Sequence, residues 1–462
     1  MELRAYQKEI IHETRQYMKQ GIKSILITSP TGSGKTILTA SMLKTCASKN
    51  MSAWFIVHRV ELIRQSIQAF HDVGVRHGII ASGFQEAKRL PIQIASMQTL
   101  ARRLDRYRKP QLIIYDECHH LPSGTWSKVF DHFPDAFHIG LTATPERLDG
   151  AGLGNHFQKM VHGKSVKWLI ENGYLSPYRI YAPSSISTRG VHTRMGDFVK
   201  SELSELVDKP TITGCAIENY KKYCNKKRAI VFASSIEHSK HIVSQFNNNG
   251  IQAAHVDGGT EKNERIRLFE EFKKGNILIL SNVDIAGEGV DVPAIEAVIL
   301  LRPTQSLGMF LQQVGRSLRI FEGKKEAIIL DHVGNVVRHG LPDEERNWSL
   351  SAEKRKKKQE GDNLHVKVCQ KCFSALESFN KKCPYCGYEF EVQSRKIEEV
   401  EGELVEVDYA ELRRKRLSAQ GQCKTLEDLI EEGKKRGYKR PHWWASNVFK
   451  ARQQKKVMGG VR

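Results

Sequence analysis

The sequence contains no apolar run that approaches the roughly 18 uninterrupted residues of a membrane-spanning helix. Glycine and proline are not enriched, at 35 and 14 of 462 residues, and no short internal repeat is visible. Collagen-like, low-complexity and wholly disordered chains are therefore excluded. Apolar residues make up 40% and charged residues 27% of the chain, as in soluble globular proteins. At roughly 150 residues per domain, the length predicts about three structural units.

The chain also begins without a recognisable signal peptide. Its first residues, MELRAYQKEI, alternate charged and apolar side chains, whereas a signal peptide has a positive segment followed by a hydrophobic one. We therefore expect a cytoplasmic protein with no membrane partner. Five of the nine cysteines are scattered and four form two Cys-x-x-Cys pairs, a pattern typical of metal binding in a reducing compartment.

Acidic residues are absent from residues 434–462, which contain ten Lys or Arg. This segment carries half of the formal net charge of +20. An excess of this size predicts a polyanionic partner, and nucleic acid is favoured over a membrane because no amphipathic or juxtamembrane helix accompanies it. For the tail by itself, a solvated basic surface is the alternative.

Short β-branched or aliphatic runs alternate with helix-length segments in two series. Continuous apolar strands of this kind indicate parallel sheets buried on both faces. We therefore predict an α/β protein with two similar lobes in tandem. The first series of strands is 24–28, 53–57, 92–96, 112–116 and 138–141, and the second is 229–233, 253–256, 277–281, 297–301 and 327–330.

Changes in composition divide the chain further. EKRKKKQEGDN at 353–363 has no apolar residue and predicts an exposed linker. Near the C-terminus, Thr425 and Asp428 have the spacing of a capping box, which predicts a helix that ends at Gly437. The predicted regions are a first lobe with its connector (1–208), a second lobe (209–340), a charged linker (341–364), a Cys-rich segment (365–392) and a basic helical tail (393–462).

Residues 29–36 read SPTGSGKT and lie between a predicted strand and a predicted helix, as a phosphate-binding loop does. Its glycines let backbone N–H groups turn toward phosphate oxygens, the lysine reaches the β and γ phosphates, and the last hydroxyl binds Mg²⁺. Ser29 stands where the strict pattern has glycine. The residues assigned to the nucleotide here are Thr31, Gly32, Ser33, Gly34, Lys35 and Thr36, of which Thr36 also binds the metal.

Asp116 and Glu117 end an apolar strand, at the edge of a parallel sheet where ligands bind. An Asp at this position can hold Mg²⁺, and the adjacent Glu can orient or deprotonate the water that attacks the γ-phosphate. Taken by itself, the pair favours the other interpretation, an ordinary acidic strand end entering a turn.

In this order the motifs resemble those of superfamily 2 helicases of the DEAD/DEAH type. The resemblance covers about residues 3–340, and LDHVGN (330–335) with the downstream Cys pairs is similar to RadD-type and phage-encoded relatives. The matching segments are LRAYQ (3–7), SPTGSGKT (29–36), VHRVEL (57–62), ASMQTL (95–100), DECH (116–119), TAT (142–144), IVFASS (230–235), SNVDIAGEGVD (281–291) and QQVGRSLR (312–319).

The resemblance implies two RecA-like lobes that bind ATP and Mg²⁺ between them. Arg4 and Gln7 correspond to the adenine motif, and Gly289 and Asp291 to the second-lobe nucleotide motif. The implied catalytic residues are Lys35, Glu117, Gln312, Arg316 and Arg319. The two arginines are candidate arginine fingers, although a surface helix is their alternative. The implied nucleic-acid contacts, for which loop capping is the alternative, are His58, Arg59, Gln98, Thr99, Ser234 and Asn282.

Cys369, Cys372, Cys383 and Cys386 form two Cys-x-x-Cys pairs separated by ten residues. Two such knuckles bring four thiolates into a tetrahedron, and CPYCGYEF resembles a zinc ribbon hairpin. Because all four ligands come from protein, the predicted zinc is structural.

The tail segment GYKRPHWWASNVFKAR (437–452) mixes aromatic and basic side chains, as single-strand binding proteins do. The spacing of Trp444 and Val448 also fits a helical core, so we assign nucleic-acid contact to the basic residues. These are Lys439, Arg440, Lys450 and Arg452.

The function predicted is an ATP-dependent DNA helicase or translocase that acts in repair, recombination or replication. We expect a monomer on single-stranded, forked or branched DNA, with a single-strand binding protein or replication and repair factors as partners. The alternatives are an ATP-gated nucleic-acid clamp that does not unwind, an RNA helicase, and the motor subunit of a nuclease. Cutting would need a partner, because no nuclease-like block precedes residue 3.

Overall fold

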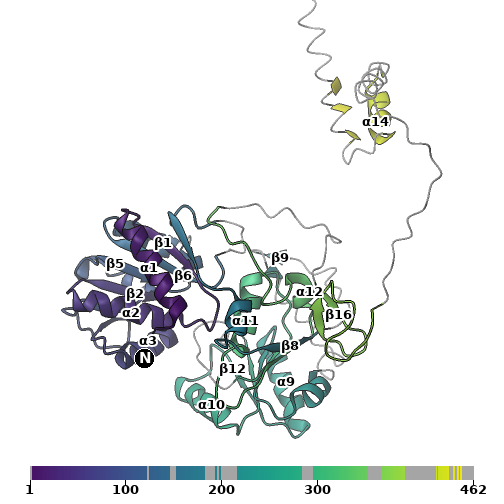
Figure 1. Ribbon diagram of the computed structural model, residues 1–462, viewed down its shortest axis with the longest axis horizontal. Coiled ribbons are helices and arrows are strands. Elements are labelled where there is room, and N and C mark those ends of the chain that lie inside the picture. The colour runs from purple at the N-terminus through teal and green to yellow at the C-terminus, as the bar shows by residue number, and fades with distance from the viewer. Residues whose placement is uncertain are drawn as a thin grey trace, which may run out of the picture. The chain divides into compact units, whose positions relative to one another are not determined.

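The computed structural model places two compact units, Met1–Glu391 and Val392–Arg462, each of which is described by itself (Figure 1). The described residues are 3–121, 124–145, 152–182, 193–194, 197–198, 216–283, 295–351, 366–390, 423, 425–435, 441–442, 445–446 and 448–449.

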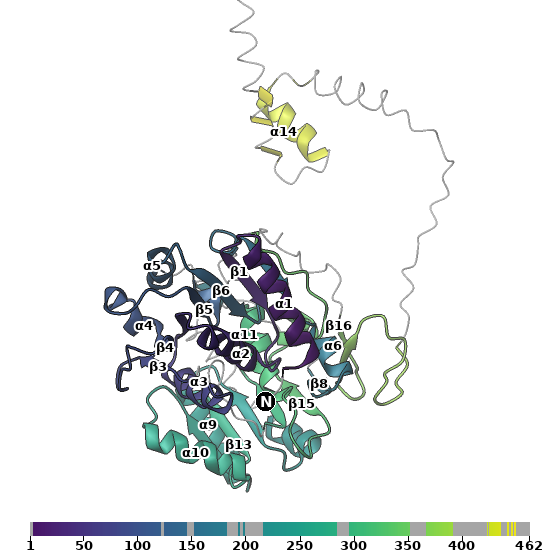
Figure 2. The same ribbon diagram turned by 60° about the vertical axis from the view of Figure 1, so that its left-hand side comes forward.

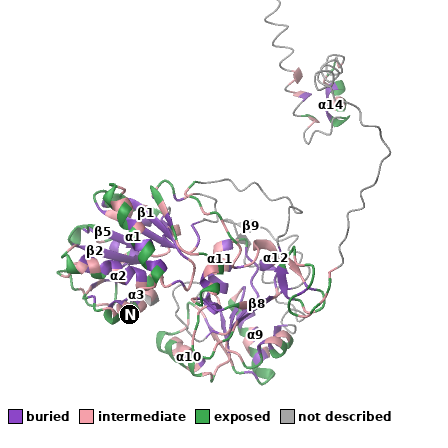
Figure 3. Cartoon of the chain, viewed as in Figure 1, coloured by how far each residue is buried: buried purple, intermediate pink, exposed green. Residues whose placement is uncertain are grey.

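The first lobe is built on a sheet of seven parallel strands in the order β3-β4-β2-β5-β6-β1-β7. Nearly every strand residue is buried (Figure 3), which agrees with the continuous apolar runs in the sequence. The strands are β1 (Ser24–Thr28), β2 (Ala53–Val57), β3 (Gly78–Ile80), β4 (Ile92–Ser96), β5 (Leu112–Tyr115), β6 (Phe137–Thr142) and β7 (Lys159–His162).

Helices pack on both faces of this sheet (Figure 2). Alternate residues of β1 belong to different core clusters: Ile25 and Ile27 to one, and Leu26 to another that includes Met97 and Trp126. The first cluster contains α1 (Ala5–Lys19), α2 (Lys35–Ser48) and α3 (Val60–Asp72), and the second contains α4 (Met97–Leu100) and α5 (Gly124–His132).

The second lobe has a sheet of six parallel strands in the order β12-β13-β11-β14-β15-β8. Its strands are β8 (Tyr178–Tyr181), β11 (Ala229–Phe232), β12 (Ala253–Val256), β13 (Ile279–Asn282), β14 (Ala297–Leu300) and β15 (Ala327–Asp331). The helices described beside it are α9 (Ile236–Asn248), α10 (Lys262–Lys274), α11 (Leu307–Ser317) and α12 (Asn335–His339). Two parallel α/β lobes confirm the predicted fold class.

The edge strand β8 comes from the segment that links the lobes. Tyr178–Tyr181 pairs in parallel with β15, so the connector assigned to 1–208 contributes a strand to the second sheet. Every strand predicted from the apolar runs overlaps an observed strand. The observed strands β3, β7 and β8 were not predicted, because none of them contains such a run. Each of these three lies at the edge of its sheet.

In the second unit, α14 (Leu426–Lys435) begins with the predicted capping box. The backbone N–H of Thr425 donates to Oδ2 of Asp428 at 2.9 Å, and the N–H of Asp428 donates to Oγ1 of Thr425 at 3.1 Å. The predicted helix end at Gly437 lies outside the described residues. Across the described part of the chain, no helix is both long enough and apolar enough to span a membrane.

Candidate active site and metal centre

The loop between β1 and α2 has the backbone that its sequence predicts. Gly32 and Gly34 have φ of 85° and 84°, left-handed values that glycine adopts without strain. Lys35 folds back over the loop, and its Nζ donates to the carbonyl oxygen of Ser29 at 3.1 Å. The hydroxyl of Ser29 donates to Oγ of Ser33 at 2.7 Å, so the serine that departs from the strict pattern bonds within the loop.

The start of α1 closes the other side of this loop. The hydroxyl of Tyr6 donates to the carbonyl oxygen of Ser33 at 2.6 Å, and Nε2 of Gln7 donates to the same oxygen at 3.2 Å. The Arg4 guanidinium lies 4.7 Å from the ring centroid of Tyr174. The predicted adenine-motif residues, Arg4 and Gln7, are therefore held beside the phosphate loop.

Asp116 and Glu117 follow β5 at the carboxyl end of the first sheet. Loss of hydration and the adjacent Glu117 raise the pKa of Asp116 to about 6, against the lowering effect of Lys35 and His58. Crowded carboxylates of this kind favour a divalent cation, so the donor set fits Mg²⁺. Glu117 has φ 48° and ψ 51°, a left-handed conformation that is uncommon for a residue with a side chain.

The carboxylate of Glu117 is linked to the end of β6 through a histidine. Nδ1 of His119 lies 3.4 Å from Oε2 of Glu117 and 3.3 Å from Oγ1 of Thr142. Thr142 Oγ1 in turn accepts from the backbone N–H of Thr144 at 3.1 Å. The DECH and TAT segments are therefore joined by direct contacts.

Helix α11 of the second lobe lies against the phosphate loop. A Cβ added to Gly315 would come 2.7 Å from Cβ of Thr31, and one added to Gly32 would come 3.5 Å from Cγ of Arg319. No larger side chain fits at position 315 without moving the helix away from the loop. This approach brings the QQVGRSLR segment and the SPTGSGKT loop together.

The predicted catalytic residues in α11 and just after it are largely enclosed. Gln312 and Arg316 are each 7% exposed, and burial lowers the pKa of Arg319. Lys324 supports the end of this helix, because its Nζ donates to the carbonyl oxygens of Ser317 and Arg319. Burial lowers the pKa of Lys324 to about 7.

Residues 341–351 form a segment, here named the strap, that runs from the second lobe back to the first. The backbone N–H of Gly154 donates to the carbonyl oxygen of Leu350 at 2.9 Å, and Leu350 packs against a first-lobe core cluster. Arg346 stiffens the strap by donating to the carbonyl oxygens of Leu341 and Glu344, at 2.8 and 2.9 Å.

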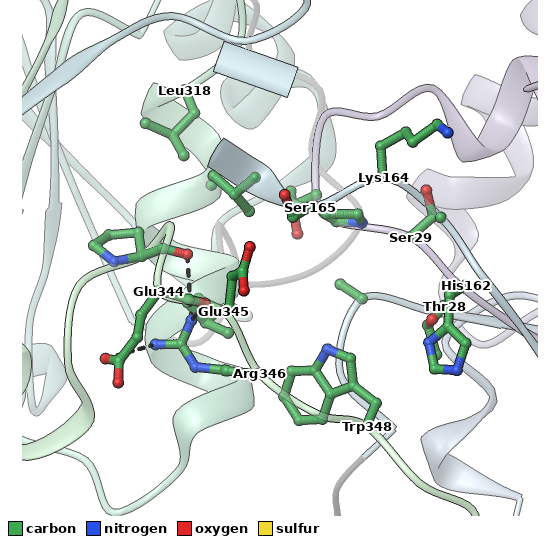
Figure 4. Close-up of a pocket in the computed structure, with 18 of the residues that line it drawn as sticks. Thr28, Ser29, His162, Lys164, Ser165, Leu318, Glu344, Glu345, Arg346 and Trp348 are labelled. Atoms are coloured by element: carbon green, nitrogen blue, oxygen red, sulfur yellow. Dashed lines mark hydrogen bonds and ion pairs between the residues drawn. The ribbon is translucent and has the colours of Figure 1, made fainter. Parts of the chain in front are cut away.

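A cavity of about 280 Å³ lies between the strap, α11 and the first half of the phosphate loop. Arg346 and Trp348 line it from the strap, across from Ser29 and Lys164 (Figure 4). Neither Lys35 nor Asp116 lines this cavity. It is a space between the lobes beside the loop, and among the described residues assigned to the nucleotide it is lined by Thr31.

The expected nucleic-acid contacts divide by exposure. Gln98 is exposed, and Arg59, Thr99 and His58 are partly exposed, all near the carboxyl ends of β2 and β4. Ser234 and Asn282 are buried, at 1% and 0% exposed, and bond within the second lobe. Ser234 Oγ lies 2.7 Å from Nδ1 of His238, and Asn282 Nδ2 donates to the carbonyl oxygen of Val231 at 2.8 Å.

In this structure neither of those two side chains is exposed. Six other predicted residues lie outside the described part of the chain, so the structure says nothing of them. They are Gly289, Asp291, Lys439, Arg440, Lys450 and Arg452.

The four cysteines of the Cys-rich segment converge. Their Sγ atoms all lie within 4.8 Å of one another, with 3.6 Å from Cys369 to Cys386 and from Cys372 to Cys383. Tetrahedral zinc with Zn–S bonds of roughly 2.3 Å places sulfurs about 3.8 Å apart. The residues present therefore fit one zinc ion with no open coordination position.

The Cys-rich segment contains an antiparallel hairpin of β16 (Val366–Val368) and β17 (Ala375–Glu377). This hairpin is attached to the edge strand β8. The backbone N–H of Ala182 donates to the carbonyl oxygen of Phe373 at 3.0 Å, and Tyr181 forms an antiparallel bridge with Ser374. The Arg179 guanidinium lies 5.4 Å from the ring centroid of Tyr385. The cysteine cluster therefore covers an edge of the second sheet that would otherwise be open.

We expect the purified protein to contain one zinc ion per chain, and Cys383→Ser to reduce zinc content and shift the thermal unfolding of the second lobe downward. The reason is that the closed thiolate site contributes directly to folding of the hairpin. Elemental analysis and calorimetry measure the two effects. Cys423→Ser, outside the cluster, is the matched control. Full zinc content in Cys383→Ser would contradict the assignment of this residue as a ligand.

Comparison with known sequence families gives two matches. Residues 1–147 match the family described as "Type III restriction enzyme, res subunit", and residues 215–321 match the "Helicase conserved C-terminal domain". A Lactococcus phage protein, named only as a 51.5 kDa protein, is 36% identical over 392 residues, which are 84% of each chain. This chain belongs to the superfamily 2 ATP-dependent helicases.

Two further relatives and one solved structure agree with the assignment of this chain to the helicase family. IRC3 of Saccharomyces cerevisiae, named as an ATP-dependent helicase, is 30% identical over 72% of this chain but only 51% of IRC3. The DNA 3'-5' translocase XPB2 of Sulfurisphaera tokodaii is 28% identical over 72% of this chain and 82% of XPB2. A fragment of a type I restriction enzyme HsdR subunit from Vibrio vulnificus has a TM-score of 0.59 and 25% identity, covering 74% of this chain and 66% of the fragment.

The helicase site also contains residues that the sequence motifs did not single out. Tyr6 bonds to the phosphate loop, and its ring packs edge-on against Trp168 and Tyr174, with centroids 5.8 and 5.3 Å away. Leu175 lies close to Gly32, because a Cβ added to Gly32 would come 2.9 Å from Cδ2 of Leu175. In the sequence, Tyr6 could have been found from its position beside Gln7. Trp168, Tyr174 and Leu175 belong to no recognisable motif.

Proposed function

We propose that this helicase couples ATP hydrolysis to movement along DNA. The observation that carries the proposal is the approach of Gly315 and Arg319 on the second lobe to Thr31 and Gly32 of the phosphate loop. Catalytic groups of the two lobes then act together only when the lobes are closed. A cycle of closing and opening driven by ATP is a known way to convert hydrolysis into motion.

In the proposed reaction the first lobe holds the triphosphate. Backbone N–H groups of the loop from Thr31 to Thr36 bind the phosphates, and Lys35 exchanges its bond to Ser29 for the β and γ phosphate oxygens. Asp116 and Thr36 would hold Mg²⁺, which supplies charge neutralisation at the phosphates. Glu117 accepts the proton of the attacking water, and Gln312 helps to position that water.

The second lobe is proposed to supply the positive charge that the transition state requires. Arg319, just after α11, lies against Gly32 of the loop, and Arg316 is proposed to act with it. A guanidinium stabilises the charge that develops on the γ-phosphate. Because these arginines reach the phosphate only with the lobes together, hydrolysis becomes conditional on closure. Gly289 and Asp291 are proposed to complete the nucleotide contacts of this lobe.

DNA is proposed as the track, bound by Arg59, Gln98 and Thr99 of the first lobe and by the basic tail. The support is the length over which XPB2, named as a DNA translocase, matches this chain, together with the net charge of +20. The predicted division into lobes, linker, ribbon and tail stays part of the proposal, as do a structural zinc, a monomeric state, and a single-strand binding protein as partner.

The proposal predicts that single-stranded DNA raises the ATPase kcat by at least about tenfold, within the range of coupling between sites. The measurement compares single-stranded, duplex and forked DNA with RNA of the same length, and follows strand displacement on the fork. Stimulation by RNA in preference to DNA would transfer the proposal to RNA. Absence of stimulation by every nucleic acid would overturn it, and stimulation without displacement would limit it to a translocase or clamp.

A further inference from the structure

Three histidines and a tryptophan form a continuous ring cluster next to the catalytic carboxylates. The ring centroids of His119 and His120 are 4.2 Å apart, and those of His120 and His58 are 5.1 Å apart. Trp126 of α5 lies beside both, 5.8 Å from His120 and 6.5 Å from His58. The helicase motifs account for His119 and for the position of His58, but they assign no role to His120 or to the contact between the two histidines.

One end of this cluster reaches the group expected to activate water. His119 contacts Glu117 and Thr142, as described for the active site. Glu117 also precedes a short 3-10 helix, Cys118–His120, and has a left-handed backbone. Strained residues and short 3-10 turns at functional sites are typical of segments that switch between two arrangements. A shift of His120 therefore moves the turn that orients Glu117.

The other end of the cluster reaches the surface expected to bind DNA. His58 directly follows β2, and its carbonyl oxygen accepts from Nε2 of the exposed Gln98 at 3.1 Å. Gln98 Oε1 accepts from the hydroxyl of Ser96 at 3.0 Å, so this amide is fixed at the carboxyl ends of β2 and β4. A strand that binds Gln98 or Arg59 therefore acts on the backbone that carries the His58 ring.

We propose that His120 is a positioning residue that couples DNA binding to hydrolysis, because its ring transmits the position of His58 to the turn that carries Glu117. This inference rests on the proposed function, since it requires DNA to stimulate the ATPase. The proposed role requires no contact of His120 with ATP or DNA. Its effect is on how far bound DNA accelerates hydrolysis, and it leaves hydrolysis without DNA and the binding of ATP as they are.

The burial of the neighbouring residues explains why the turn that carries Glu117 responds to the ring contact between His120 and His58. Cys118 lies in the sequence between Glu117 and His119, and its side chain is fully buried. A movement of the turn that pushed Cys118 further inward would require the core to repack. His120 is partly exposed and presents a flat ring to His58 and to Trp126. The Trp126 side chain is 6% exposed and limits the movement of both rings. Motion of the His58 loop is thereby directed to the turn.

The first experiment measures ATPase kinetics of His120→Ala with and without a single-stranded oligonucleotide. We expect the DNA-stimulated kcat to fall by about tenfold or more, toward the basal rate, a loss within the usual range of coupling between sites. The basal kcat, the KM for ATP and the affinity for DNA should each stay within about twofold. His120→Phe, which keeps a ring in the same place, should recover most of the stimulation.

His71→Ala is the matched control, because the His71 side chain is 82% exposed at the end of α3. Its stimulation by DNA should equal that of the unaltered protein. If His120→Ala lowers the basal and the stimulated kcat in parallel, or leaves both unchanged, the coupling role is overturned. If the unaltered protein itself is not stimulated by DNA, the proposed function fails first, so the two failures are distinguishable.

A double-mutant cycle tests the contact between the rings. The DNA-stimulated kcat is measured for His58→Ala, His120→Ala and the double variant. If the residues act through one another, the double variant should lose no more than the more severely affected single variant, as for residues that act as a unit. Losses that multiply would mean that His58 and His120 act independently, and would overturn the relay.

Discussion

Lys35→Ala should reduce the ATPase kcat by at least about a hundredfold, because removal of one preorganised positive or donor group from a transition state typically costs that much. Lys35 is the cation at the start of α2, and its Nζ already lies 3.1 Å from the carbonyl oxygen of Ser29 in the phosphate loop. It also lowers the pKa of Asp116. Its loss should therefore raise the pKa of Asp116 as well as weaken phosphate binding.

Lys44→Ala provides the control, since Lys44 is exposed on the same helix. Steady-state phosphate release, with circular dichroism to verify folding, gives the comparison. Unchanged kcat in a folded Lys35→Ala protein would mean that SPTGSGKT is not the phosphate-binding loop, and the assignment of the active site would be lost.

Arg319→Ala should lower the DNA-stimulated kcat by on the order of 10³-fold, as for arginines that act across a phosphate site. Arg319 follows α11, and its side chain packs on Gly32 from the second lobe. Because the transition state needs its charge and planar geometry, Arg319→Lys should recover only a small part of the rate. Binding of ATP should change far less than kcat.

The control for this prediction is Arg267→Ala in α10, whose side chain is 62% exposed and paired with Glu264. Single-turnover ATP hydrolysis separates chemistry from product release. If Arg319→Ala hydrolyses ATP at the full rate while Arg316→Ala does not, the arginine finger is Arg316. If both variants keep full rates, α11 supplies no catalytic charge.

The sequence predicts central strands far better than edge strands. β1, β2, β5 and β6 are buried on both faces and therefore read as continuous apolar runs. The edge strand β7, KMVH, is only partly buried, so its composition is that of a loop. β8 could not be assigned to the second lobe from local pattern, because its partner β15 is remote in the sequence.

The active site was predictable where one short segment carries its own chemistry. The phosphate loop, Asp116 and the cysteine pairs are of this kind, since spacing within a few residues defines them. Burial of Ser234 and Asn282 depends on how α9 and β11 pack, which no local motif records. The strap could not be foreseen either, because Leu350 packs on the first lobe through one backbone bond and a shared apolar core.

The origin of β8 in the connector affects how the chain can fold during synthesis. The strands of the first sheet end at His162, so they can assemble early on the ribosome. β8 emerges next but finds its place only after Asp331 has been made. Meanwhile its backbone groups can pair with other nascent chains. Chaperone occupancy of ribosome-bound chains should therefore be highest between these two points.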